Sequence, residues 1–66
     1  MMEDRILRRK NVRESTGLSD SQVDREEEAG NFPKRRKITE RTVGWSYIEI
    51  QAWIYSRLHA DAEAKQ

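Results

Sequence analysis

A run of basic side chains lies just past the middle of the chain. Lys34, Arg35, Arg36 and Lys37 are consecutive, and residues 34–41 together hold five basic residues and one acidic residue. Lysine and arginine neutralise phosphates and release the counterions condensed on DNA, which supplies affinity for DNA of any sequence. A run of this kind also occurs on strand edges, where it protects against aggregation. The run therefore predicts either a contact with a nucleic-acid backbone or a guarded sheet edge.

A second set of polar groups lies upstream, between residues 19 and 28. Gln22 can pair bidentately with adenine and Arg25 with guanine, while Ser21 can contact either a phosphate or a base. Five acidic residues in the same segment oppose this interpretation, because a carboxylate repels a phosphate. These acids are Asp20, Asp24, Glu26, Glu27 and Glu28. The segment suits two functions, the reading of base edges in DNA or the binding of a basic protein partner.

Other chemistries lack the residues that they need. The chain has no cysteine and a single histidine, His59, so we expect no disulfide, no thiol chemistry and no metal site. Acid pairs such as Asp20 and Asp24 have too little chain around them to form a water-excluding pocket. We therefore expect no enzyme, no catalytic residue, no cofactor and no small-molecule substrate. The spacing of Trp45 and Trp53 favours a place in the core over base stacking.

The length of 66 residues predicts one small domain. Charged residues make up 38% of the chain and hydrophobic residues 35%, and a domain of about 60 residues buries only about 60% of the surface that its unfolded chain exposes. The core must therefore be thin. No apolar run approaches the roughly 20 residues of a membrane span, and residues 1–4 lack the apolar part of a signal peptide. We expect a cytoplasmic protein with no membrane partner.

Two helices are predicted in the first half of the chain. The first covers about residues 9–16 and is followed by Gly17, which suits the left-handed conformation that closes a helix. Ser19 and Gln22 form a capping-box pattern that starts a second helix over residues 20–29. A connection of about three residues between two helices is the helix-turn-helix arrangement.

A short hairpin is predicted next. Residues 37–39 and 42–45 both favour strands, and Glu40 and Arg41 form the turn between them. Residues 4–8 hold one apolar pair between basic flanks, which predicts either a brief strand or the start of the first helix.

Ser46 then caps a third helix over residues 47–60, with Glu49 at the capping-box position. Its apolar residues fall on one amphipathic face and an adjoining stripe, so the apolar arc is unusually wide. The face comprises Ile50, Trp53, Ile54 and Leu58, and the stripe comprises Ile48, Ala52 and Tyr55.

Short motifs follow one another in a distinctive order along the chain. Thr16-Gly17-Leu18-Ser19 is followed by Gly30-x-Phe32-Pro33-Lys34, and then by Val43-Gly44-Trp45 and Glu49-Ile50-x-Ala52-Trp53. From about Arg5 to Arg57, this order resembles the AlpA family of small phage and prophage transcriptional regulators. These are related to excisionases and to the winged-helix DNA-binding domain of MerR-type proteins.

The resemblance implies a mainly α domain with a small β-hairpin, a winged helix-turn-helix of three helices plus a wing. We expect this single domain over residues 1–60 and a frayed tail over 61–66. The second helix is implied to enter the major groove, and the hairpin is implied to be the wing. By position, the recognition helix carries Ser19, Ser21, Gln22 and Arg25. The wing carries Lys34, Arg35, Arg36, Lys37, Arg41 and Thr42.

The predicted function is that of a sequence-specific DNA-binding protein. It would regulate transcription or excision (recombination directionality) of a prophage or integrative element in a bacterial cytoplasm, at the nucleoid. Expected partners are double-stranded DNA, an integrase or recombinase, and further copies of the chain that bind DNA cooperatively. The alternative is a protein-interaction module, an inhibitor or adaptor, that uses the acidic helix 20–29 and the apolar arc of helix 47–60. A continuous negative face on the second helix would favour this alternative.

Overall fold

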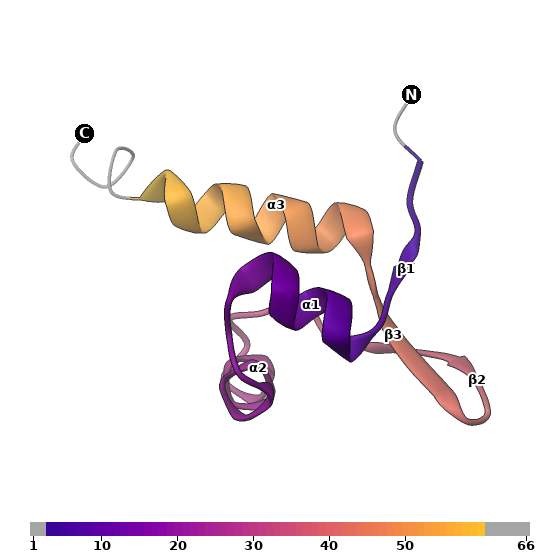
Figure 1. Cartoon of the computed structure of the whole chain (residues 1–66). Coiled ribbons are helices and arrows are strands. Elements are labelled where there is room, and N and C mark those ends of the chain that lie inside the picture. Colours follow the sequence, from indigo (N-terminus) through magenta and orange to yellow (C-terminus); the bar gives the residue numbers. More distant parts are fainter. Residues whose placement is uncertain (1–2, 61–66) are drawn as a thin grey trace.

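Residues 3–60, which the computed structural model describes, form three helices and a three-stranded antiparallel sheet. Figure 1 shows α3 along one side of the molecule, α1 and α2 on the other, and the β2–β3 hairpin projecting as an arm. This arrangement confirms the predicted fold of three helices and a hairpin, and residues 6–7 form a strand. The elements are β1 (Ile6–Leu7), α1 (Arg9–Thr16), α2 (Asp20–Glu28), β2 (Arg36–Thr39), β3 (Thr42–Ser46) and α3 (Tyr47–Leu58).

Local hydrogen bonds set the turn between α1 and α2. Gly17 closes α1 with a φ of 77°, in the left-handed region that favours glycine. Ser19 Oγ accepts the Gln22 N–H at 3.2 Å, and Gln22 Oε1 accepts the Ser19 N–H at 3.0 Å. This is the predicted capping box, and it fixes the first turn of α2 relative to α1.

The start of α3 differs in part from the prediction. Ser46 Oγ accepts the Glu49 N–H at 3.2 Å, but the Glu49 carboxylate pairs with Arg36 instead of completing a capping box. Asp4 supplies the carboxylate, because it accepts hydrogen bonds from the Ser46 hydroxyl and from the Ile48 N–H. These hydrogen bonds lower the pKa of Asp4. The segment before β1 therefore helps to hold the N-terminus of α3, where a carboxylate is favoured by the helix dipole.

β3 is the central strand of the sheet, between β1 and β2. Leu7 lies opposite Trp45, and Arg36 lies opposite Gly44. A Cβ atom on Gly44 would lie 2.6 Å from Ile6 Cγ2 and 3.0 Å from the Leu7 carbonyl oxygen. Gly44 therefore lets the Ile6 side chain lie across the central strand.

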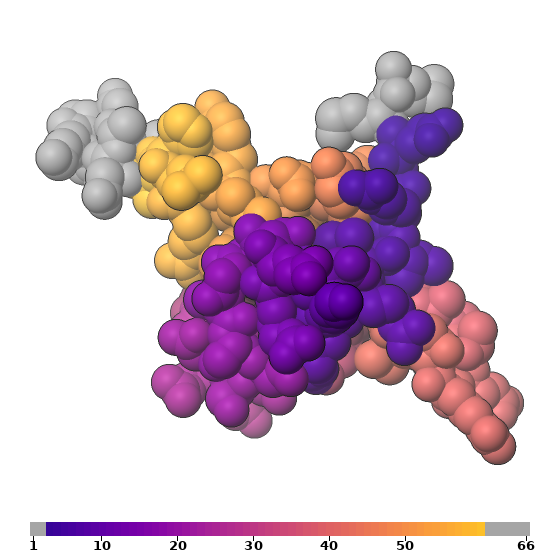
Figure 2. All heavy atoms as spheres, viewed as in Figure 1, coloured from indigo at the N-terminus to yellow at the C-terminus, as the bar shows by residue number. Residues whose placement is uncertain are grey.

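The core contains six buried apolar residues drawn from α1, α2, α3, the sheet and the loop after α2. The predicted arc of α3 is only partly used, because Ile50 is fully buried whereas Tyr55 and Leu58 are 63% and 75% exposed. The expected place of Leu58 on the core face is wrong. Figure 2 shows that the end of α3 (yellow) projects beyond α1 and α2 (purple), so these two helices do not cover it. The core residues are Leu7, Val12, Val23, Phe32, Trp45 and Ile50.

None of the helices described between residues 3 and 60 is long and apolar enough to cross a membrane. The same stretch of chain holds no group of histidine, aspartate and glutamate side chains suited to a metal ion.

Candidate nucleic-acid interface

The outer face of α2 presents three polar side chains that can donate hydrogen bonds, together with the exposed Glu28, which helical geometry places about 140° from Val23. Val23 is only 1% exposed and points into the core, so helical geometry places Ser21 and Arg25 about 160° from it, on the outer side. Both are exposed, and Arg25 has no ion pair within residues 3–60. Gln22 is also exposed, and its cap uses only the Oε1 atom and the backbone N–H. This face thus offers a hydroxyl, a guanidinium and an amide.

Asp20 and Asp24, on the flank of α2 nearest α1, are paired with arginines. Asp20 Oδ1 lies 3.5 Å from both Arg9 Nη1 and Arg13 Nε. Asp24 Oδ1 accepts a hydrogen bond from Arg9 Nη2 at 3.3 Å and another from Arg35. The hydrogen bond from Arg35, together with the positive charge of Arg9, lowers the pKa of Asp24. These acids are therefore matched by cations from α1 and from the loop before β2.

Glu27 ties α2 to the sheet. Its Oε1 accepts a hydrogen bond from Arg35 Nε at 2.9 Å, and its Oε2 accepts one from Trp45 Nε1 at 2.7 Å. The guanidinium carbons of Arg35 and Arg9 lie 5.2 and 5.7 Å from the centre of the Trp45 ring, which is within cation–π range. Burial opposes the charge of Arg35, but hydrogen bonds to Asp24 and Glu27 raise its pKa overall.

We call these six residues the acid–arginine cluster: Arg9, Arg13, Asp20, Asp24, Glu27 and Arg35. Glu26, on the other flank of α2, lies 3.8 Å from Arg57 of α3. Of the five acids on α2, only Glu28 has no ion pair with another described residue. The helix therefore carries no continuous negative face, which is the feature that an acidic docking helix requires.

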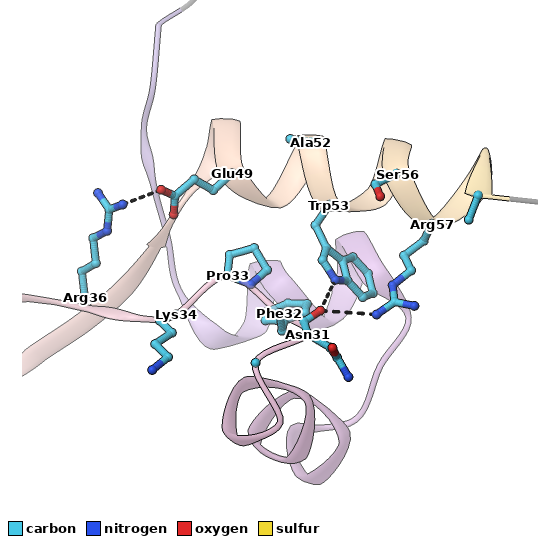
Figure 3. Close-up of a pocket in the computed structure, with 12 residues that line it drawn as sticks. Asn31, Phe32, Pro33, Lys34, Arg36, Glu49, Ala52, Trp53, Ser56 and Arg57 are labelled. Atoms are coloured by element: carbon cyan, nitrogen blue, oxygen red, sulfur yellow. Dashed lines mark hydrogen bonds and ion pairs between the residues drawn. The ribbon is translucent and has the colours of Figure 1, made fainter. Parts of the chain in front are cut away.

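The sheet register separates the members of the basic run. Arg36 pairs with Glu49 of α3, as Figure 3 shows. Lys37 lies opposite Val43. Val43 and Trp45 lie on the same face of β3, and the Trp45 indole reaches α2. Lys37 therefore lies on the face of the hairpin that looks toward α2, and Arg36 lies on the opposite face. Arg35 belongs to the acid–arginine cluster.

Three basic residues around the hairpin make no ion pair with any residue between 3 and 60: Lys34, Lys37 and Arg41. All three are exposed, and Arg41 lies in the turn between β2 and β3. The Lys34 side chain points away from α3, toward the side where α2 lies (Figure 3). Thr42 is half-buried at the start of β3. Lys34, Lys37 and Arg41, together with Arg25, are therefore the basic side chains that are open to an anionic partner.

An open groove of about 690 Å³ is lined by α3 and by the loop that joins α2 to β2 (Figure 3). The Asn31 carbonyl oxygen accepts hydrogen bonds from Trp53 Nε1 at 2.6 Å and from Arg57 at 3.4 Å. Phe32 packs edge-to-face on Trp53, with 4.8 Å between the ring centres. These contacts fix the path of the loop and thereby the position of the hairpin relative to α2.

The structure places Ser21, Gln22 and Arg25 together on exposed positions of α2, and Lys37 on the same face of the hairpin as Trp45. It uses Ser19 as a helix cap, and it turns Arg35 and Arg36 toward carboxylates. Sequence reasoning did not foresee Arg9 and Arg13 as partners of α2. The available signal was the separation of charge, with basic residues in the first helix and five acids in the second.

Comparison with known protein families gives a match over nearly the whole described chain. The model of the family described as prophage CP4-57 regulatory protein (AlpA) matches residues 5–58. This span runs from β1 to the end of α3 and includes the outer face of α2 and the hairpin. A search of curated proteins gives no match.

Proposed function

Because this chain belongs to the AlpA family of prophage regulatory proteins, which are DNA-binding regulators and not enzymes, we propose that it binds double-stranded DNA sequence-specifically as a winged helix-turn-helix. In this proposal α2 enters the major groove and the hairpin, as the wing, follows the phosphate backbone. The observation that supports it is the pairing of four α2 acids with arginines. That pairing offsets the repulsion that four of the five carboxylates would exert on DNA, and leaves that of Glu28.

The proposal assigns different tasks to the two parts of the surface. Ser21, Gln22 and Arg25 contact base edges, where arginine favours guanine and glutamine favours adenine. Ser19 presents the N-terminus of α2, whose free N–H groups and dipole favour a phosphate. The wing supplies phosphate contacts that position the protein without reading sequence. Lys34, Lys37, Arg41 and Thr42 make these contacts, while Arg35 and Arg36 hold the wing in place through their ion pairs.

The regulated process in this proposal is transcription or excision of an integrated element, in the bacterial cytoplasm at the nucleoid. A single module of this kind buries only roughly 600–1,000 Å² on DNA. Cooperative binding by further copies, or contact with an integrase, would supply the remaining affinity. The competing function, an adaptor that offers an acidic helix to a basic protein, is disfavoured because Asp20, Asp24 and Glu27 are already paired.

A mobility-shift titration tests the proposal. The full chain is titrated onto duplex tiles from the flanks of its own coding locus, at two salt concentrations, with random DNA as competitor. Shifts that are confined to particular tiles and survive the competitor support sequence-specific binding. An absence of binding at low salt would contradict DNA binding altogether, and uniform binding to every tile would contradict base readout.

A further inference from the structure

The acid–arginine cluster has no net charge, since it contains three arginines and three carboxylates. A helix that lies in a major groove about 12 Å wide has a phosphate backbone along each flank. The cluster lies on one such flank, beside the outer face of α2. A phosphate that approaches Arg9 or Arg13 must therefore compete with carboxylate oxygens that lie 3.3–3.5 Å from those guanidinium groups.

The acids of this flank add little to the stability of the fold. The side chains of Asp20 and Asp24 are 46% and 53% exposed, and ion pairs at such exposure contribute little because solvent screens them. Glu27 differs, because its side chain is only 12% exposed and it holds the indole of Trp45. The two aspartates can therefore be changed without removing a main support of the domain, and their effect falls chiefly on the electrostatics of the DNA-facing side.

We propose that Asp20 and Asp24 suppress the sequence-independent affinity of the chain for DNA. Because they pair with Arg9 and Arg13, two fewer cations are available to neutralise phosphates. The affinity that counterion release would add at those phosphates is therefore lost. Affinity then depends more on the contacts of Ser21, Gln22 and Arg25 with base edges. This inference rests on the proposed function, because it assumes that α2 faces DNA.

The test compares binding to random duplex DNA over a range of salt concentrations. In Asp20→Asn/Asp24→Asn the amides no longer neutralise Arg9 and Arg13, so about two further cations reach phosphates. Each added phosphate contact steepens the slope of log K against log salt by about 0.9, so the slope steepens by up to about 1.8. At 0.1 M salt, affinity for random DNA rises about 10- to 60-fold.

Glu3→Gln/Glu14→Gln is the matched control. It makes the same change in net charge, and neither glutamate forms an ion pair within residues 3–60. Glu14 lies with Arg5 and Tyr47 along a shallow pocket, away from the cluster. Thermal melting of both double variants establishes that each is folded.

A steeper slope in the aspartate variant alone supports the inference. Equal shifts in both variants, or an unchanged slope in the aspartate variant, would overturn it while leaving the proposed function intact. A wild-type chain that binds no DNA at low salt would overturn the proposed function and this inference together.

Discussion

The indole nitrogen of Trp45 donates a 2.7 Å hydrogen bond to Glu27 and so joins the root of the wing to the last turn of α2. Trp45 is 2% exposed, and the same carboxylate also binds Arg35. The two parts of the proposed DNA-binding surface are thereby held at a fixed separation. A contact of this kind matters for recognition, because the helix and the wing must meet the same duplex.

Glu27→Ala is expected to lower the free energy of unfolding by about 1–3 kcal/mol, the usual cost of leaving a buried donor without its partner. Chemical denaturation measures this loss. Glu28→Ala is the control, since Glu28 is exposed and has no ion pair with a described residue, and it should change stability by less than about 0.5 kcal/mol. Equal effects of the two substitutions would show that the Trp45 contact does not support the fold.

Elements with local signals were predicted from sequence. Ser19 and Gln22 lie three residues apart, and Gly17 precedes them, so the helix-turn-helix follows from neighbouring residues. Contacts between distant residues were not predicted. Asp4 and Ser46 meet only after β1 pairs with β3, and Arg9 meets Asp24 only after α1 packs on α2.

The separation of Arg35, Arg36 and Lys37 could not be predicted for a related reason. Four consecutive cations look alike in a sequence, and only the register of β2 against β3 decides which face each one occupies. Similarly, Leu58 has the spacing of a core residue, but the domain is too small to cover the last turn of α3.

Gly44→Ala is expected to destabilise the sheet by about 1–3 kcal/mol, the usual cost of overpacking. The new methyl group would lie 2.6 Å from Ile6 Cγ2 and 3.0 Å from the Leu7 carbonyl oxygen. Thermal melting measures the effect, and Ile6→Ala in the same chain should restore part of the loss. An unchanged melting temperature for Gly44→Ala would contradict the close approach of β1 to β3.

The stability of the fold is expected to fall in acid. Hydrogen bonds from Ser46 and Ile48 hold the pKa of Asp4 below its ordinary value of 3.8 in the folded chain. Because the folded pKa is the lower one, the contribution of Asp4 is fully present above about pH 4 and is lost as pH falls through the folded value. Denaturation midpoints between pH 7 and pH 2 measure this loss. Asp4→Asn should flatten the acid limb, and an unchanged profile would contradict the capping role.

Lys37→Ala/Arg41→Ala is expected to weaken binding to all DNA sequences alike and to flatten the salt slope by about 1.8, or about 0.9 for each lost phosphate contact. Both residues lie on the wing without an ion pair to any described residue. The control Arg5→Ala/Lys10→Ala removes the same charge from the segments at β1 and α1. Fluorescence anisotropy with labelled random duplex measures the slopes, and equal flattening by both pairs would contradict a specific role for the wing.

The most direct test of base readout by α2 compares wild type and Arg25→Ala on a specific tile and on random DNA, by anisotropy at one salt concentration. The wild type should prefer the tile by at least about 10³-fold. Arg25→Ala should lower that preference by about 10- to 100-fold, because a bidentate base contact contributes about 1–3 kcal/mol of discrimination. An equal loss of affinity for both duplexes would show that Arg25 contacts only phosphate, and would contradict the assignment of the outer face of α2 to base recognition.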